Sequence, residues 1–193
     1  MTETQEAFRD FLIRFQQTAI RETGRRPTVA LRDGIDEELL MPGCLSAGYS
    51  FWQPMPWPQD MPQLADMETH FHRSILDLFT FCRYHELSFV VPVPQRQGIY
   101  SYLYKRQFVT VQNTMKALPL DALNDAMIRH DQLSKLPLYF PFAATDPQGE
   151  AFVLCLQADT GECCLFSPSR ENVYHSLGLS VCEMLKLIKP SFL

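Results

Sequence analysis

The stretch AFVLCLQADTGECCLFS, residues 151–167, carries the clearest fold signal in this chain of 193 residues. Two apolar runs, 151–158 and 163–167, are separated by Asp159, Thr160, Gly161 and Glu162. A polar, glycine-containing connection this short joins neighbouring strands that run in opposite directions. The stretch therefore predicts a β-hairpin and, with it, an antiparallel sheet.

Further strands are predicted on the N-terminal side of this hairpin. Residues 88–93 and 99–104 are rich in β-branched and aromatic side chains and flank a polar turn, while 108–111 either extend the second strand or form another. Residues 136–143 contain Pro137 and Pro141, which indicates a sheet edge or a bulge, since proline cannot donate to the strand ladder. The remaining candidate is a short strand at 48–53.

Helical patterns lie at both ends of the chain. Apolar residues at three- and four-residue steps from Phe8 to Ala19 predict an amphipathic helix that ends near Thr23, before Gly24. Similar stripes predict helices at 64–82, 120–132 and 176–188, the last with a capping box formed by Ser180 and Glu183. Residues 24–63, rich in proline and glycine, are predicted to form a long irregular connection.

Helices at both ends that enclose closely connected strands are typical of an α+β fold. We therefore expect one domain spanning residues 1–193, with a mostly antiparallel or mixed sheet and helices packed to one side.

The charge of the chain is concentrated in one region. From residue 33 to residue 82 there are eight acidic residues and one basic residue, so the net charge of this window is −7. The net charge of the whole chain is −5, and that of the remaining residues is therefore +2. Such a window is either an ordinary solvated surface or a field that attracts a basic partner. The overall negative charge disfavours nucleic acid as a partner, because phosphate binding needs a basic surface.

The composition also bears on location. No run approaches the roughly 20 apolar residues of a membrane span. Glu3 and Glu6 stand where a signal peptide would be positively charged, so we expect a cytoplasmic protein. The six scattered cysteines are then expected to be small buried hydrophobic residues.

Motifs for catalysis or metal binding are missing from the sequence. His70 and His72 are two residues apart in a predicted helix and so point about 200° away from each other. Glycine-rich phosphate loops and nucleophile elbows are absent, and a Cys155 pair with His130 or His175 has no support from spacing. We therefore expect no enzymatic activity, cofactor or metal.

The segment YSFWQPMPWP, residues 49–58, contains both tryptophans and three alternating prolines. Large aromatic side chains are enriched in interface hot spots, but they also fill cores beneath loops. The prolines stiffen the segment in either case. The residues alone leave both interpretations open.

Several short motifs, in order along the chain, resemble those of the Syd family of SecY-interacting proteins, within the wider SUKH superfamily. They are the aromatic-Trp-Gln-Pro box at 51–54, the Ala-Met-Ile-Arg-His run at 126–130, the Leu-Pro strand at 136–140, the Gly-Glu-Cys turn at 161–163 and the Leu-Lys-x-x-Lys-Pro end at 185–190. The resemblance spans nearly the whole chain.

This resemblance implies a protein without catalytic activity that uses an acidic surface to bind the basic cytoplasmic loops of the SecY translocon subunit, and so associates peripherally with the inner membrane. The SUKH relationship implies an alternative, an immunity protein that neutralises a toxin nuclease. The acidic surface and the aromatic anchor together predict a partner-binding set: Asp33, Asp36, Glu37, Glu38, Trp57, Asp60 and Glu68. Trp52, inside the family box, is expected to be buried, and Trp57 to face the partner.

Overall fold

The predicted hairpin lies within a seven-stranded antiparallel sheet. The computed structural model describes residues 1–33, 35–46, 48–57, 71–92, 106–110, 139–145, 152–166 and 174–192. The hairpin strands are β7 (Val153–Gln157) and β8 (Glu162–Phe166), and the strand order is β10-β4-β5-β6-β7-β8-β9. The hairpin prediction is thus confirmed.

The other strands of this sheet come from both sides of the hairpin. They are β4 (Ser88–Val90), β5 (Gln107–Thr110), β6 (Tyr139–Thr145), β9 (Tyr174–Ser180) and the two-residue β10 (Lys189–Pro190). The pairing of β6 with β7 shifts register between Pro141 and Ala143. This bulge, one of the two predicted alternatives, lets proline stand inside a sheet, because a bulged residue does not need to donate to the ladder. The predicted strand at 99–104 and helix at 120–132 lie outside the described residues.

A second sheet occupies part of the predicted irregular connection. It has three antiparallel strands in the order β1-β3-β2, formed by β1 (Thr28–Ala30), β2 (Leu40–Ser46) and β3 (Tyr49–Trp52). A 3-10 turn, η1 (Glu37–Leu39), precedes β2. The strand predicted at 48–53 is therefore correct, whereas the prediction of irregular structure around it is wrong. Only three residues of β1 pair with β3, and their alternation is too brief to be recognised as a strand.

The N-terminal helix follows its sequence pattern closely. Helix α1 (Glu3–Thr23) begins at a Thr2–Gln5 capping box and ends at Gly24, whose φ of 72° is the left-handed conformation that closes many helices. Its predicted apolar stripe, from Phe8 to Ala19, is buried.

Two other predicted helices are shorter than their stripes indicated. Helix α3 (Arg73–Phe81) begins after His72, which is extended and acts as the N-cap, so a helix running unbroken from 64 to 82 is wrong at this residue; residues 64–70 lie outside the described part. Helix α5 (Val181–Leu187) starts at the predicted Ser180–Glu183 capping box. The residues before it, expected to be helical from 176, instead form β9.

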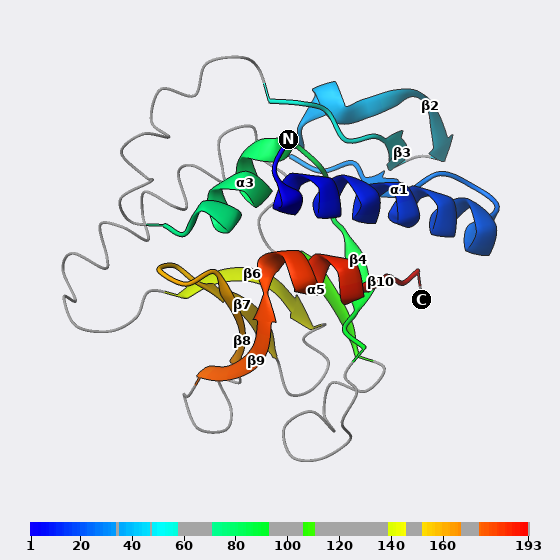
Figure 1. Cartoon of the computed structure of the whole chain (residues 1–193). Coiled ribbons are helices and arrows are strands. Elements are labelled where there is room, and N and C mark those ends of the chain that lie inside the picture. Colours follow the sequence, from blue (N-terminus) through cyan, green and yellow to red (C-terminus); the bar gives the residue numbers. More distant parts are fainter. Residues whose placement is uncertain are drawn as a thin grey trace.

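One Phe-rich core joins the two sheets and the helices. Figure 1 shows α1 lying between the three-stranded sheet and α5, which covers the larger sheet. Phe15 of α1 contacts Trp52 of β3 with ring centroids 6.1 Å apart, and Phe11 contacts Phe89 of β4 at 6.1 Å. Trp52 is 1% exposed, as predicted. The observed architecture is α+β, as expected from the sequence.

The turn of the β7–β8 hairpin packs tightly against the start of α3. Gly161 has a φ of 67°, and a Cβ there would lie 2.5 Å from Ser74 Oγ and 2.6 Å from His72 Nδ1. These two side chains bond to each other, and His72 Nδ1 accepts from Ser74 N–H to cap the helix. Glycine is thus required by both backbone conformation and space.

We predict that Gly161→Ala lowers the free energy of unfolding by about 2–3 kcal/mol, combining left-handed strain with loss of the α3 cap. Gly178→Ala is the matched control, because Gly178 has a similar φ of 63° but open space around it. Its cost should be about 1 kcal/mol, from strain alone. Urea unfolding of both variants measures the difference; equal losses would contradict the packing role of Gly161.

Candidate functional site

A buried arginine brings several of the predicted partner-binding residues together. Arg83 Nη1 lies 2.8 Å from Asp36 Oδ2, and Nη2 lies 2.7 Å from Glu38 Oε2. The Arg83 and Asp36 side chains are 6% and 2% exposed, whereas that of Glu38 is 54% exposed. Burying each of these ions costs its hydration energy, so each needs an opposite charge at hydrogen-bonding distance.

The proline-rich segment completes the same site. Met55 and Arg83 form a β-bridge with hydrogen bonds of 3.0 and 2.7 Å, and the Arg83 guanidinium carbon lies 5.9 Å from the centre of the Trp57 ring. The indole N–H of Trp57 donates to the carbonyl of Phe79 at 3.1 Å. We call the set Asp36, Glu38, Met55, Trp57 and Arg83 the Arg83 junction.

Local sequence positions the acids of the junction. Asp36 is the N-cap of η1, and its Oδ1 accepts from Glu38 N–H at 3.2 Å. The turn that follows buries Leu39, whose carbonyl accepts from Gln53 N–H at 3.1 Å. We call Asp33, Asp36, Glu37 and Glu38 the acidic turn. It is held against the 53–57 segment by main-chain bonds and by Arg83.

The predicted partner-binding residues lie in different environments. Asp33 and Glu37 are exposed, and Glu38 is half exposed while bonded to Arg83. Asp36, expected on the surface, is buried and serves as an internal counter-charge, so this part of the prediction is wrong. Trp57 is half-buried and tied to Phe79 and Arg83, while Asp60 and Glu68 lie outside the described residues.

Arg83 itself was missed by the sequence reasoning. The acidic window ends at Cys82, one residue before it, and extending the window would have changed its charge from −7 to −6. A basic residue directly after an acidic stretch is a weak signal. The ion pair forms only because Asp36, 47 residues away, is brought back by the three-stranded sheet.

His85, two residues after Arg83, is buried against Trp52. Its ring is fully buried and meets Trp52 edge to face, with centroids 5.6 Å apart. Among the described residues, no hydrogen bond of acceptable geometry reaches either ring nitrogen, nor the Trp52 indole N–H. Burial lowers the pKa of His85 below its ordinary 6.5, against the opposing effect of the Asp36 main chain and the Asp36 and Glu86 carboxylates.

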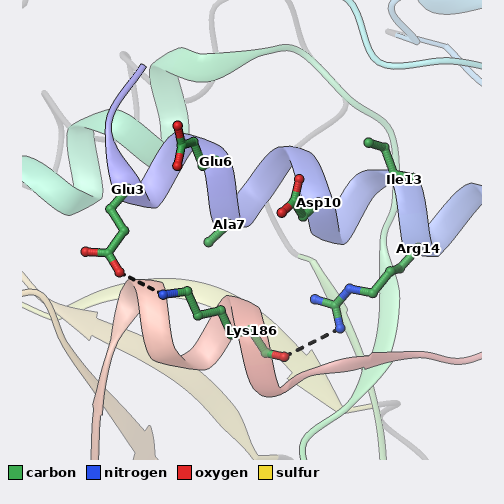
Figure 2. Close-up of a pocket in the computed structure, with 7 residues that line it drawn as sticks. All are labelled: Glu3, Glu6, Ala7, Asp10, Ile13, Arg14 and Lys186. Atoms are coloured by element: carbon green, nitrogen blue, oxygen red, sulfur yellow. Dashed lines mark hydrogen bonds and ion pairs between the residues drawn. The ribbon is translucent and has the colours of Figure 1, made fainter.

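Two hollows flank the exposed face of α1. The first, about 600 Å³, lies between α1 and α5; Figure 2 shows Glu3 paired with Lys186 at one end and Arg14 bonded to the Lys186 carbonyl at the other. The Lys186–Glu3 distance is 2.7 Å, and Arg14 Nη2 donates to the Leu185 carbonyl at 2.8 Å. The charged groups of this hollow thus largely hold the two helices together.

The second hollow, about 370 Å³, lies on the other side of Ile13, next to the proline-rich segment. Its apolar lining consists of Leu12, Ile13, Pro54, Met55, Pro56 and Phe81, and Arg9, Gln16 and Cys82 complete it. We call it the apolar groove. It shares Met55 with the Arg83 junction.

The thiols show the chemistry of buried structural cysteines. Burial raises the pKa of Cys155 to about 12 and that of Cys164 to about 11. A thiol in this state is a poor nucleophile, because the thiolate is the reactive form. In the described ranges no three potential metal ligands come together. None of the helices described is long and apolar enough to cross a membrane.

The chain was also compared with known proteins. No protein-family model matches it, and no curated protein matches it. The resemblance to the Syd family accordingly stays a prediction.

We predict that Asp36→Asn lowers the free energy of unfolding by about 3 kcal/mol, because it leaves a buried guanidinium with half its compensation. Asparagine keeps the η1 cap, so the loss reports the ion pair rather than the turn. The neighbouring exposed Glu37→Gln is the control and should change stability by less than about 0.5 kcal/mol. Denaturant unfolding monitored by tryptophan fluorescence tests this; a near-neutral Asp36→Asn would contradict the structural role of the pair.

His85 predicts a dependence of stability on pH. Below pH 6.5 the histidine binds a proton in the unfolded chain while it stays neutral in the folded protein, so stability falls as the pH falls through this range. His85→Phe removes the proton difference and should flatten the unfolding free energy between about pH 6.5 and 5. His175→Phe, at a half-buried position on β9, provides the comparison. Identical pH slopes for the wild type and His85→Phe would be the contrary result.

Proposed function

We propose that this protein is a non-enzymatic binding module that engages a basic segment of another protein through the acidic turn. The observation that carries the proposal is that Glu37 and Glu38 are exposed to solvent on a turn that Asp36 caps and that Arg83 contacts, with Asp33 exposed three residues before that cap. Carboxylates on a fixed support bind a basic segment with less entropic cost than carboxylates on a free loop. The resemblance to the Syd family implies that the partner is a basic cytoplasmic loop of SecY.

The electrostatics of the turn support a role in recognition. Two basic residues close to the turn in sequence or by contact are already paired: Arg32 with Glu86 at 2.7 Å, and Arg83 with Asp36 and Glu38 at 2.8 and 2.7 Å. Exposed carboxylates whose basic neighbours are paired leave a net negative potential, which raises the rate of encounter with a basic partner.

Membrane association and a role for Trp57 would follow from the same binding mode. A peripheral association with the inner membrane would then arise through the partner, on the cytoplasmic side. Trp57 would contribute the exposed part of its ring, while its indole N–H bond to Phe79 and its contact with Arg83 hold the ring in position. Aromatic residues with one fixed side are typical interface anchors, since little side-chain entropy is lost on binding.

The proposal predicts salt-dependent binding to peptides with the sequences of the SecY cytoplasmic loops. Affinity measured by fluorescence anisotropy should fall several-fold between about 50 and about 300 mM NaCl, because the charges are exposed. The double substitution Asp33→Lys with Glu37→Lys should weaken binding about tenfold without unfolding the protein, since both side chains are exposed.

Asp159→Lys supplies the matched control, because Asp159 is an exposed carboxylate on the β7–β8 turn, away from the junction. It should leave the affinity within about twofold of the wild type, as expected for a charge that makes no contact. The double substitution changes the net charge by +4 and Asp159→Lys by +2, so a loss of binding free energy for Asp159→Lys half that of the double variant would reduce the interaction to net charge. Binding that is insensitive to both salt and the double substitution would overturn the proposal.

A further inference from the structure

The apolar groove differs in chemistry from the acidic turn, although the same segment builds both. Six of its lining residues are apolar, and they come from two elements, α1 and the segment 54–56, with Phe81 at the end of α3. Its volume of about 370 Å³ is at the lower end of the range of ligand pockets, roughly 300–1,000 Å³. A hollow with this lining accepts an apolar side chain and penalises a charged one, which would lose its hydration.

The segment 53–57 joins the groove to the acidic turn. Gln53 N–H donates to the carbonyl of Leu39 at the end of η1, and Met55 pairs with Arg83, which holds Asp36 and Glu38. Pro54, Met55 and Pro56 face the groove as one wall. One β-bridge and one arginine side chain therefore separate the groove from the carboxylates of the turn.

The wall is formed before any partner arrives. Pro54 and Pro56 have restricted backbones, and Met55 uses both main-chain groups in its bridge with Arg83. A preformed groove binds with a smaller loss of conformational entropy than one that must be ordered by its ligand. The single basic group in its lining, Arg9, is paired with Asp10 at 2.9 Å, so its charge is offset locally.

We propose that the apolar groove receives a large apolar side chain, preferably aromatic, from the same basic segment that the acidic turn binds. This inference rests on the proposed function and narrows its partner to a segment in which an aromatic residue stands close to lysine or arginine. The charge of the occupant follows from the exposed carboxylates of the acidic turn. Its anchor follows from the groove, where the Met55 thioether and the Phe81 ring offer contacts that aromatic side chains favour.

Two peptides of equal charge test the inference. Both are lysine-rich; one carries a single phenylalanine, and in the other serine replaces it. The wild-type protein should bind the phenylalanine peptide about tenfold more tightly, as expected for burial of one large apolar side chain. Ile13→Gln and Met55→Gln, which make the groove more polar, should each remove most of this preference. Ile13 lies outside the Arg83 junction, so Ile13→Gln should also leave the affinity for the serine peptide unchanged.

Ile20→Gln is the control on the same helix. Ile13 and Ile20 are both exposed, at 46% and 50%, but Ile20 does not line the groove. Ile20→Gln should keep the full preference for phenylalanine. Circular dichroism melting of all three variants confirms that they fold like the wild type, as expected from surface positions and an unchanged main-chain bridge at Met55.

The outcomes separate this inference from the proposed function. If both peptides bind with equal affinity in the wild type, or if the groove variants keep the preference for phenylalanine, the groove inference is wrong. The proposed function still stands in that case, provided that the double substitution Asp33→Lys with Glu37→Lys weakens the binding of both peptides. If the double variant weakens the binding of neither peptide, the proposed function is wrong. The proposal that the groove takes part in that function is then wrong as well.

Discussion

The structure around the Arg83 junction depends on the buried ion pair between Arg83 and Asp36. A guanidinium group cannot lose its proton inside a protein, so a buried arginine must be given negative partners. Asp36 and Glu38 provide them from a turn that lies 47 and 45 residues earlier in the chain. This requirement draws the three-stranded sheet, η1 and the proline-rich segment together over α1. Two strands of that sheet, β1 and β3, have only three and four residues, so the ion pair adds a long-range contact that helps to fix where the sheet lies.

The ion pair also divides the acidic residues of the chain by role. Asp36 and Asp77 belong to the first group: they are buried and paired with Arg83 and Arg73, and they serve the fold. Asp33 and Glu37 form the second group, which faces solvent and contributes to the potential around the turn. Glu38 belongs to both, because it bonds Arg83 with one oxygen while half of its side chain stays exposed. Net charge in a sequence window cannot separate these roles, since the division depends on which acids are themselves buried against a cation.

The sequence predicted those features whose causes are local. The β7–β8 hairpin, the end of α1 at Gly24 and the capping box at Ser180 all depend on residues within a few positions of one another, and all are found as expected. Residues 176–180 were assigned to helix because Leu177 fits the stripe of α5 at i+4 with Val181. In the structure Leu177 and Leu179 alternate along β9, and pairing with β8 overrides the helical pattern. The Arg83 junction could not be predicted, since its contacts span the chain and no local pattern marks an arginine as buried.

The alternating prolines at 54 and 56 explain why the segment beside the junction is neither strand nor free loop. Proline has no N–H, so only Met55 can both donate to and accept from a neighbouring chain in this stretch, and it does so with Arg83 alone. The bridge therefore cannot lengthen into a strand that would join either sheet. The restricted backbones of Pro54 and Pro56, on both sides of Met55, keep the segment extended. Its side towards α1 lines the apolar groove, and it ends at the contact between Trp57 and Arg83. The segment that contains both tryptophans thus has one buried anchor, Trp52, one half-exposed aromatic, Trp57, and between them a rigid wall. That wall is suited to hold an apolar side chain and a charged surface at a constant separation.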